Sequence, residues 1–132
     1  MIMKPVLIAL ALAVLAANTA ALAAPQSPAN VQIFETDMGF HFVNKDGHTL
    51  YVYDGDEKPL KSTCVAACAK NWPPLLAEPG KTASGSYSVI TRDDGTRQYA
   101  YKGMPLYRFA KDAKPGDRTG DNLNNVWHVA KP

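Results

Sequence analysis

Short apolar runs, each four to six residues long and closed by a turn signal, dominate the chain from residue 31 onward. Runs of this length that are rich in β-branched and aromatic residues are typical of strands rather than helices. Glycine turns such as Asn44-Lys45-Asp46-Gly47 and Lys102-Gly103 join successive runs, because glycine supplies the positive φ that a tight hairpin needs. The pattern predicts an all-β chain with strands at residues 31–35, 40–43, 49–53, 87–91, 97–101, 104–109 and 126–130.

This pattern occurs twice, at a spacing of 56 residues. Between residues 37 and 59, 8 of the 23 positions are identical to those found 56 residues later. The identical pairs are Asp37/Asp93, Gly39/Gly95, Gly47/Gly103, Leu50/Leu106, Tyr51/Tyr107, Asp56/Asp112, Lys58/Lys114 and Pro59/Pro115. Trp72 and Trp127 lie near the ends of the two units, where we expect them to be structural aromatic residues. We therefore predict two repeats, at residues 31–76 and 87–130, within a single domain of residues 31–132.

Each repeat is predicted to form a three-stranded antiparallel meander. Side chains alternate across a strand, so Tyr51 and Tyr53 share one face, as do Tyr107 and Phe109. Arg108 indicates that the opposite face is partly solvated, and we expect the aromatic face to point inward. A small sheet that is exposed on both sides would be marginally stable. The two meanders should therefore pack together as a small sandwich or a partly closed barrel.

One short helix is predicted in the first repeat, over residues 65–70, and it carries the cysteines. Ser62 or Thr63 can act as its N-cap, because a hydroxyl oxygen accepts a hydrogen bond from a free N–H of the first turn. Pro73 ends the helix, since the residue before a proline is pushed out of the α region.

The N-terminus reads as a signal peptide over residues 1–23. Lys4 precedes an uninterrupted apolar run, and Ala21-Leu22-Ala23 supplies a small-residue cleavage site. The run is too short to span a bilayer, for which about 20 apolar residues are needed. We expect export to the periplasm or the medium, a disordered lead-in at residues 24–30, and no membrane span after cleavage.

Charge excludes one class of partner. Without Lys4, 13 basic and 12 acidic side chains remain, and none of the basic ones form a run. Binding to nucleic acid depends on clustered Lys and Arg that neutralise phosphates, so we expect no nucleic-acid partner.

The chain resembles a bacterial family of secreted repeats and predicted lipoproteins. Its motif, Y-x-[FWY]-x-x-D, occurs here as Tyr51-Val52-Tyr53-Asp54-Gly55-Asp56 and as Tyr107-Arg108-Phe109-Ala110-Lys111-Asp112. Many relatives carry a lipidated cysteine, which this chain lacks. The resemblance implies export and a tandem-repeat fold, and it implies no reaction.

Cys64 and Cys68, the two cysteines of the chain, admit two interpretations. An oxidising compartment favours a disulfide. Residues four apart on a regular helix have Cβ atoms about 5–6 Å apart, whereas a relaxed disulfide needs about 3.5–4.5 Å, so a bridge requires a distorted turn. The alternative is a copper or thiol-redox site, because thiolates are soft ligands. A further ligand would then come from His41, His48, His128, Met38 or Met104.

The acidic loops offer little specific chemistry. Asp54, Asp56 and Glu57 follow the first meander, and Asp112, Asp117 and Asp121 lie in the second loop. Such oxygen-rich loops can hold Ca²⁺, but the spacing matches no EF-hand. We expect the repeated Asp56 and Asp112 to cap backbone N–H groups of the loops that they begin. No nucleophile elbow, zinc-protease motif or phosphate-binding loop is present.

The sequence thus predicts an exported, non-enzymatic tandem-repeat protein without a cofactor. Its expected role is that of a binding or structural module of the cell envelope, with an envelope partner or a small ligand. A copper-binding or thiol-redox protein that uses Cys64 and Cys68 is the alternative.

Overall fold

The computed structural model describes Met3, Pro28 and residues 30–132. Apart from single positions, the predicted signal peptide (residues 1–23) and the predicted lead-in (residues 24–30) lie outside the described residues. Within the described part, no helix combines the length and the apolar character that crossing a membrane requires.

The first repeat opens with a hairpin of two strands. β1 (Gln32–Thr36) pairs antiparallel with β2 (Gly39–Val43), and a two-residue turn joins them. β3 (Tyr51–Tyr53) follows, but it pairs along its length with β7 (Trp127–Val129), the last strand of the second repeat. The first repeat therefore departs from the predicted meander in its third strand, which a bridge between Val43 and Thr49 ties to the hairpin. Pairing with β7 brings the ring of Tyr53 onto that of Trp127, with their centroids 4.4 Å apart.

The second repeat forms the predicted meander. β4 (Tyr87–Thr91), β5 (Arg97–Tyr101) and β6 (Met104–Pro105) form one antiparallel sheet in that order. β6 is shorter than the predicted strand at residues 104–109, because the chain leaves β5 after Leu106, whose N–H still donates to the Tyr99 carbonyl at 3.0 Å. Tyr107 then bridges both Tyr51 and Pro74.

The helix begins later than the sequence predicts. α1 (Ala67–Asn71) has Ala66 as its N-cap, and no side chain caps it. The prediction of Ser62 or Thr63 as the cap is wrong, because both hydroxyl groups bind elsewhere: Ser62 contacts Tyr107, and Thr63 donates to Asp56. A short 3-10 helix, η1 (Leu123–Asn125), precedes β7.

The two repeats interlock through their turns. A side chain at Gly47 would lie 3.1 Å from Pro115, and one at Gly103 would lie 3.2 Å from Pro59. Both glycines also have positive φ, 84° and 80°, which glycine adopts readily. The glycine and proline positions that the two repeats share therefore form a contact between the repeats.

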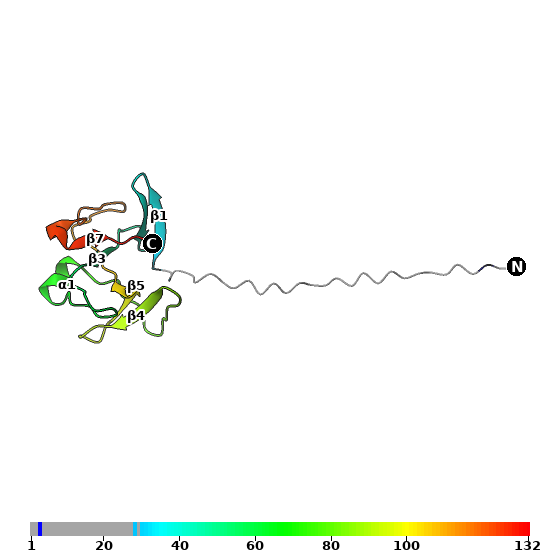
Figure 1. The fold of residues 1–132 in the computed structure, drawn as a ribbon, viewed down its shortest axis with the longest axis horizontal. Helices are drawn as coiled ribbons and strands as arrows, with labels where there is room; N and C mark the ends of the chain where they lie inside the picture. The colour runs from blue at the N-terminus through cyan, green and yellow to red at the C-terminus, as the bar shows by residue number, and fades with distance from the viewer. Residues whose placement is uncertain (1–2, 4–27, 29) are drawn as a thin grey trace.

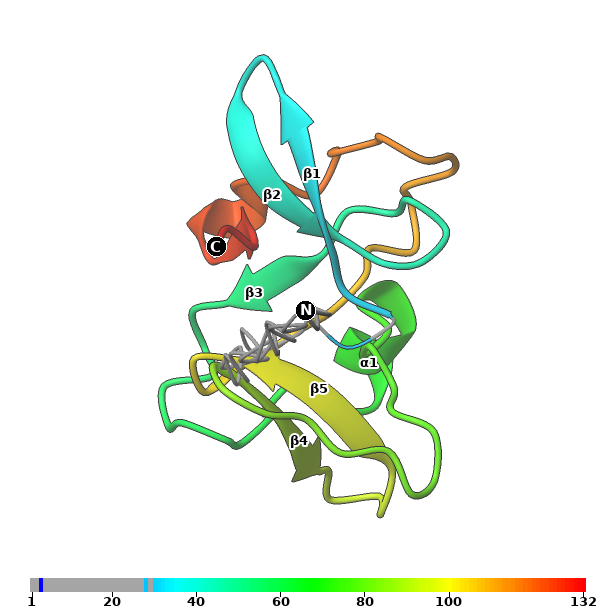
Figure 2. The ribbon, with the colours of Figure 1, turned by 90° about the vertical axis from the view of Figure 1, so that its right-hand side faces the viewer.

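Two buried clusters form the core, and each draws on both repeats. One contains Phe42, Leu50 and Leu106, and the other contains Tyr51 and Trp127. Figures 1 and 2 show β3 between the β1–β2 hairpin at one end of the domain and the β4–β5 pair at the other. Small antiparallel sheets thus pack as a sandwich, and within the described residues they close no barrel.

Candidate functional site

A pair of crossed tyrosine–aspartate hydrogen bonds lies at the centre of the molecule. The Tyr51 hydroxyl donates to Asp112 Oδ2 at 2.5 Å, and the Tyr107 hydroxyl donates to Asp56 Oδ2 at 2.6 Å. Each tyrosine thus binds the aspartate of the other repeat. The backbone repeats this reciprocity, because Tyr51 N–H donates to the Tyr107 carbonyl at 2.8 Å and Tyr107 N–H donates back at 2.9 Å. An approximate twofold axis therefore passes between the two tyrosines.

The second carboxylate oxygen of each aspartate binds a threonine seven residues later and so holds the loop between them. Asp56 Oδ1 accepts from both the backbone N–H and the hydroxyl of Thr63, each at 2.7 Å. Asp112 Oδ1 accepts from the same two groups of Thr119, at 3.0 and 2.5 Å. The expected capping of backbone N–H groups by Asp56 and Asp112 is confirmed. The threonines are also 56 residues apart, a signal that extending the repeat alignment would have revealed.

Both tyrosines are fully buried, as their strand positions predict. Burial raises the pKa of Tyr51 and of Tyr107 well above the usual value, and the hydrogen bond to a carboxylate raises each pKa further. The two phenols therefore stay neutral at physiological pH, where they serve as hydrogen-bond donors.

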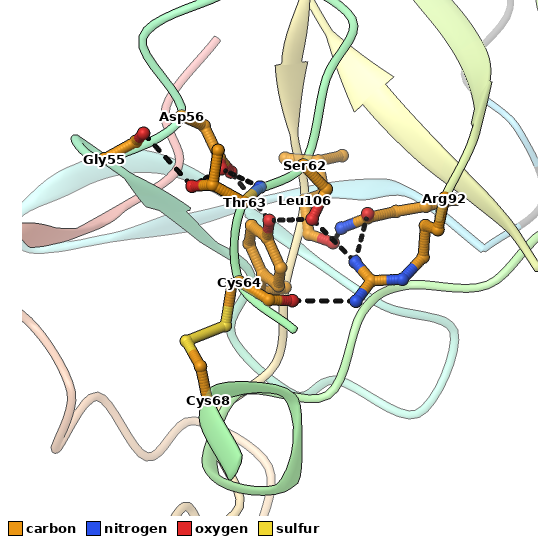
Figure 3. The surroundings of a disulfide bond; sticks show 10 residues. Gly55, Asp56, Ser62, Thr63, Cys64, Cys68, Arg92 and Leu106 are labelled. Atoms are coloured by element: carbon orange, nitrogen blue, oxygen red, sulfur yellow. Dashed lines mark hydrogen bonds between the residues drawn. A yellow bond between two sulfur atoms is a disulfide. The ribbon is translucent and has the colours of Figure 1, made fainter. Parts of the chain in front are cut away.

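A buried arginine breaks the symmetry on the side of the first aspartate. Arg92 Nη1 donates to Ser62 Oγ at 2.7 Å, and Nη2 donates to the Cys64 carbonyl at 2.7 Å. Ser62 in turn contacts the Tyr107 hydroxyl at 2.7 Å, and Tyr107 donates to Asp56. A chain of hydrogen bonds thus connects Arg92 to Asp56; Figure 3 labels Arg92, Ser62 and Asp56. Sequence reasoning missed this arginine, because a lone Arg after a strand carries no signal.

Cys64 and Cys68 form the predicted disulfide, with Cα atoms 5.2 Å apart. Cys64 lies before α1 and Cys68 lies within it, so the pair does not sit on one regular helix. Ala66 supplies the distorted turn that such a bridge requires, with φ 53° and ψ −120°. Figure 3 shows the bridge on the side of the residue 55–64 loop that faces α1.

Four aromatic rings stack beside the tyrosine pair. Trp72 and Trp127 lie at the middle of the stack, with ring centroids 3.8 Å apart and planes 3° apart. Tyr53 covers Trp127 at 4.4 Å, and Phe109 covers Trp72 at 4.2 Å. Tyr53 and Phe109 are equivalent positions of the two repeats, so the stack follows the same approximate twofold axis.

The residues proposed as further copper ligands are scattered. His128 contacts Asp54 at 2.8 Å through Nε2, and the Met38 sulfur accepts from Arg118 at 3.5 Å. His41 is buried in the β1–β2 hairpin. In the part of the chain that the structure describes, no three or more His, Cys, Asp or Glu side chains group as a metal site would need.

Two further acidic residues of the second loop, Asp117 and Asp121, also accept hydrogen bonds from the backbone, one within the loop and one from β7. Asp117 Oδ2 accepts from the N–H groups of Ala113 and Lys114, at 3.0 and 3.1 Å. Asp121 Oδ1 accepts from the N–H of Val129 at 3.1 Å. Asp117 therefore stabilises the loop itself, and Asp121 ties the loop to β7.

Comparison with known proteins gives one match. A family model described as a secreted repeat of unknown function matches the chain twice, at residues 32–76 and 88–131. No curated protein and no solved structure matches.

Proposed function

We propose a function from the premise that this chain belongs to the family of secreted repeats of unknown function. The chain is a secreted repeat protein, and we propose that it acts in the periplasm as a non-enzymatic binding module of the cell envelope. Its proposed partner is an envelope protein that adds an extended segment to the β1–β2 hairpin.

The observation that carries the proposal is a group of four large apolar side chains that are exposed on this hairpin. Ile33, Phe34, Met38 and Phe40 are 50, 54, 70 and 54% exposed. In Figure 2 the hairpin projects from one end of the domain. Ile33 and Phe40 share one face of it, because Phe40 pairs with Glu35, and Phe34 lies on the other face beside His41. Large apolar side chains that gather on a surface mark a site of interaction.

The edge of the hairpin suits a protein partner. β1 pairs with β2 along one edge, and among the described residues no strand pairs with the other edge. A free edge presents unpaired backbone N–H and C=O groups, which an extended peptide can satisfy by adding a strand. The exposed side chains on both faces of β1 would then contact side chains of the added segment.

The chemistry of the central residues supports a non-enzymatic role. Asp56 and Asp112 each use both carboxylate oxygens within the protein. The phenols of Tyr51 and Tyr107 remain neutral, because burial raises the pKa of each. These residues hold the repeats together, which leaves none of them available to act on a substrate. The copper or thiol-redox alternative is not favoured, because the two sulfur atoms are joined to each other rather than free to bind a metal, and Cys64 is fully buried, away from a reducing partner.

Site-specific photocrosslinking in the native host cell tests the proposal. A photoreactive amino acid at Ile33 or Phe40 should give one discrete adduct with an envelope protein. Leu76, which is 47% exposed and lies outside the hairpin, is the matched control position and should give none.

The adduct should also disappear when the hairpin carries Met38→Lys and should persist with Leu60→Lys, another exposed apolar side chain outside the hairpin. Equal adducts at Ile33 and Leu76, or no adduct at either, would contradict the proposal. An adduct between two copies of this chain would make the hairpin a self-assembly surface and would exclude a distinct partner.

A further inference from the structure

A small pocket lies under the opposite face of the hairpin from Ile33. Phe34, Thr36, His41 and Val43 form one wall, and the turn at Gly47 and the loop at Pro115 form the other. Its volume is about 200 Å³ and its lining is mostly apolar. An apolar cavity of about 150 Å³ accommodates a benzene ring, so the pocket has the size of a small ring compound.

His41 is the polar group of this pocket. Its side chain is 2% exposed, and neither Nδ1 nor Nε2 has a hydrogen-bond partner in the protein. Its ring meets Phe34 edge to face, with the centroids 6.0 Å apart. Buried polar groups are normally paired, because an unpaired donor or acceptor loses the hydrogen bond that water would give it. The two unpaired nitrogens of His41 therefore favour binding of a ligand that brings a hydrogen-bonding group into the pocket.

A water molecule alone would fit the pocket poorly. The Thr36 hydroxyl already donates to the Gly39 carbonyl and accepts from the Met38 N–H. A buried water needs two to four polar partners, and the lining side chains offer it little beyond His41. A mostly apolar molecule with a single polar group matches this lining better.

The charged residues near His41 indicate whether the polar group of such a ligand is anionic or cationic. Arg118 and Lys131 act on the ring electrostatically, and together with the larger effect of burial they lower the pKa of His41. Arg118 also has a buried Nε with no partner, although its other nitrogens approach Met38 and Asp121. A positive field with unpaired N–H donors favours an anion.

We propose that this pocket binds a small apolar monocarboxylate of about the size of benzoate. The carboxylate would accept a hydrogen bond from the imidazole N–H of His41 on the side of Arg118, and the apolar part would lie against Phe34, Val43 and Pro115. This site lies on the hairpin face opposite Ile33 and Phe40 and shares Phe34 with the partner surface proposed above. It is tested separately, because benzoate binding requires no protein partner.

Nitrogen NMR of the histidine rings tests the proposal directly on the full domain. Titration with benzoate should shift the ring nitrogens of His41 in a saturable manner. It should leave those of His128 unchanged, since His128 does not line the pocket and both of its ring nitrogens have partners, Asn122 and Asp54. Benzamide has the same ring without the charge, and it should bind at least tenfold more weakly. Unmoved His41 nitrogens, or equal binding of benzoate and benzamide, would overturn the proposal.

Two variants with matched controls give a second test. His41→Phe should abolish benzoate binding, whereas His48→Phe, outside the pocket, should retain it. Arg118→Gln should weaken benzoate binding several-fold, whereas Arg108→Gln should leave it unchanged. If His41→Phe does not fold, the Arg118 and Arg108 pair still decides the matter. Equal affinities for these two variants would contradict a carboxylate on the side of Arg118.

Discussion

The crossed arrangement of the tyrosines and aspartates can be tested by double-mutant cycles. Tyr51→Phe removes the hydroxyl that donates to Asp112 at 2.5 Å and leaves a buried carboxylate oxygen without that partner. Hydrogen bonds to charged groups contribute about 1.5–3 kcal/mol, and we expect a loss of that size in the free energy of unfolding. The Gly120 N–H donates to the same hydroxyl at 3.3 Å. Tyr51→Phe removes this acceptor as well, so we expect a loss toward the upper end of that range.

The decisive quantity is the coupling energy between pairs of changes. Tyr51→Phe combined with Asp112→Ala should cost less than the sum of the two single changes, by about 1–2 kcal/mol, because both remove the same bond. Tyr51→Phe combined with Asp56→Ala is the matched control, since Asp56 is the aspartate of the same repeat and binds Tyr107 instead. That pair should be additive to within about 0.5 kcal/mol.

Urea unfolding of the disulfide-bonded protein at pH 7 measures all of these free energies. The reciprocal cycle, Tyr107→Phe with Asp56→Ala, should show coupling as well. A coupling between Tyr51 and Asp56 as large as that between Tyr51 and Asp112 would refute the crossed arrangement. Additivity in both pairs would show that the hydroxyl groups contribute nothing specific.

Three further predictions concern the disulfide, the tyrosine pKa values and the aromatic stack. Changing both Cys64 and Cys68 to Ser should lower the free energy of unfolding by only about 2 kcal/mol and preserve the far-UV spectrum, because the closed loop is short; complete unfolding would contradict this. Stability should fall above pH 10, by up to about 1.4 kcal/mol per pH unit for each of Tyr51 and Tyr107, because the raised pKa favours the neutral phenol in the folded state and the unfolded pKa is about 10. Urea midpoints between pH 8 and 11 should show this, and each Tyr→Phe change should remove one tyrosine's share. Gly120→Ala should cost about 1–3 kcal/mol and weaken the near-UV signal of the stack, since its Cβ would lie 2.6 Å from the Trp72 ring; an unchanged signal would mean that the stack yields freely.

Local patterns predicted those parts of the fold that depend on neighbours in sequence. The bounds of β4 and β5 match the predicted strands, because alternation and glycine turns define a hairpin locally. The burial of Tyr51 and Tyr107 followed from the strand period together with Arg108, which marked the opposite face as solvated. The disulfide followed from the expected compartment, and its distorted turn followed from the geometry of four-residue spacing.

Such local patterns could not predict the contacts between the two repeats. An alignment shows that Tyr51 is equivalent to Tyr107, but it does not show that each binds the aspartate of the other repeat. The pairing of β3 with β7 joins strands more than 70 residues apart, and no turn signal indicates it. The start of α1 was misplaced because Thr63, a good N-cap on propensity, binds Asp56 more favourably.

The difference between the two repeats indicates where function should be sought. What the copies share holds the domain together: the crossed hydrogen bonds, the glycine–proline contacts and the ends of the aromatic stack. A residue with such a duty cannot change without loss of stability, so it is a poor place for specific recognition. The hairpins have diverged instead, because β4 buries Tyr87 and Ile90, whereas no residue of β1 is buried. Duplication thus left β4 to complete the core and left β1 free to carry the proposed partner surface and part of the wall of the pocket at His41.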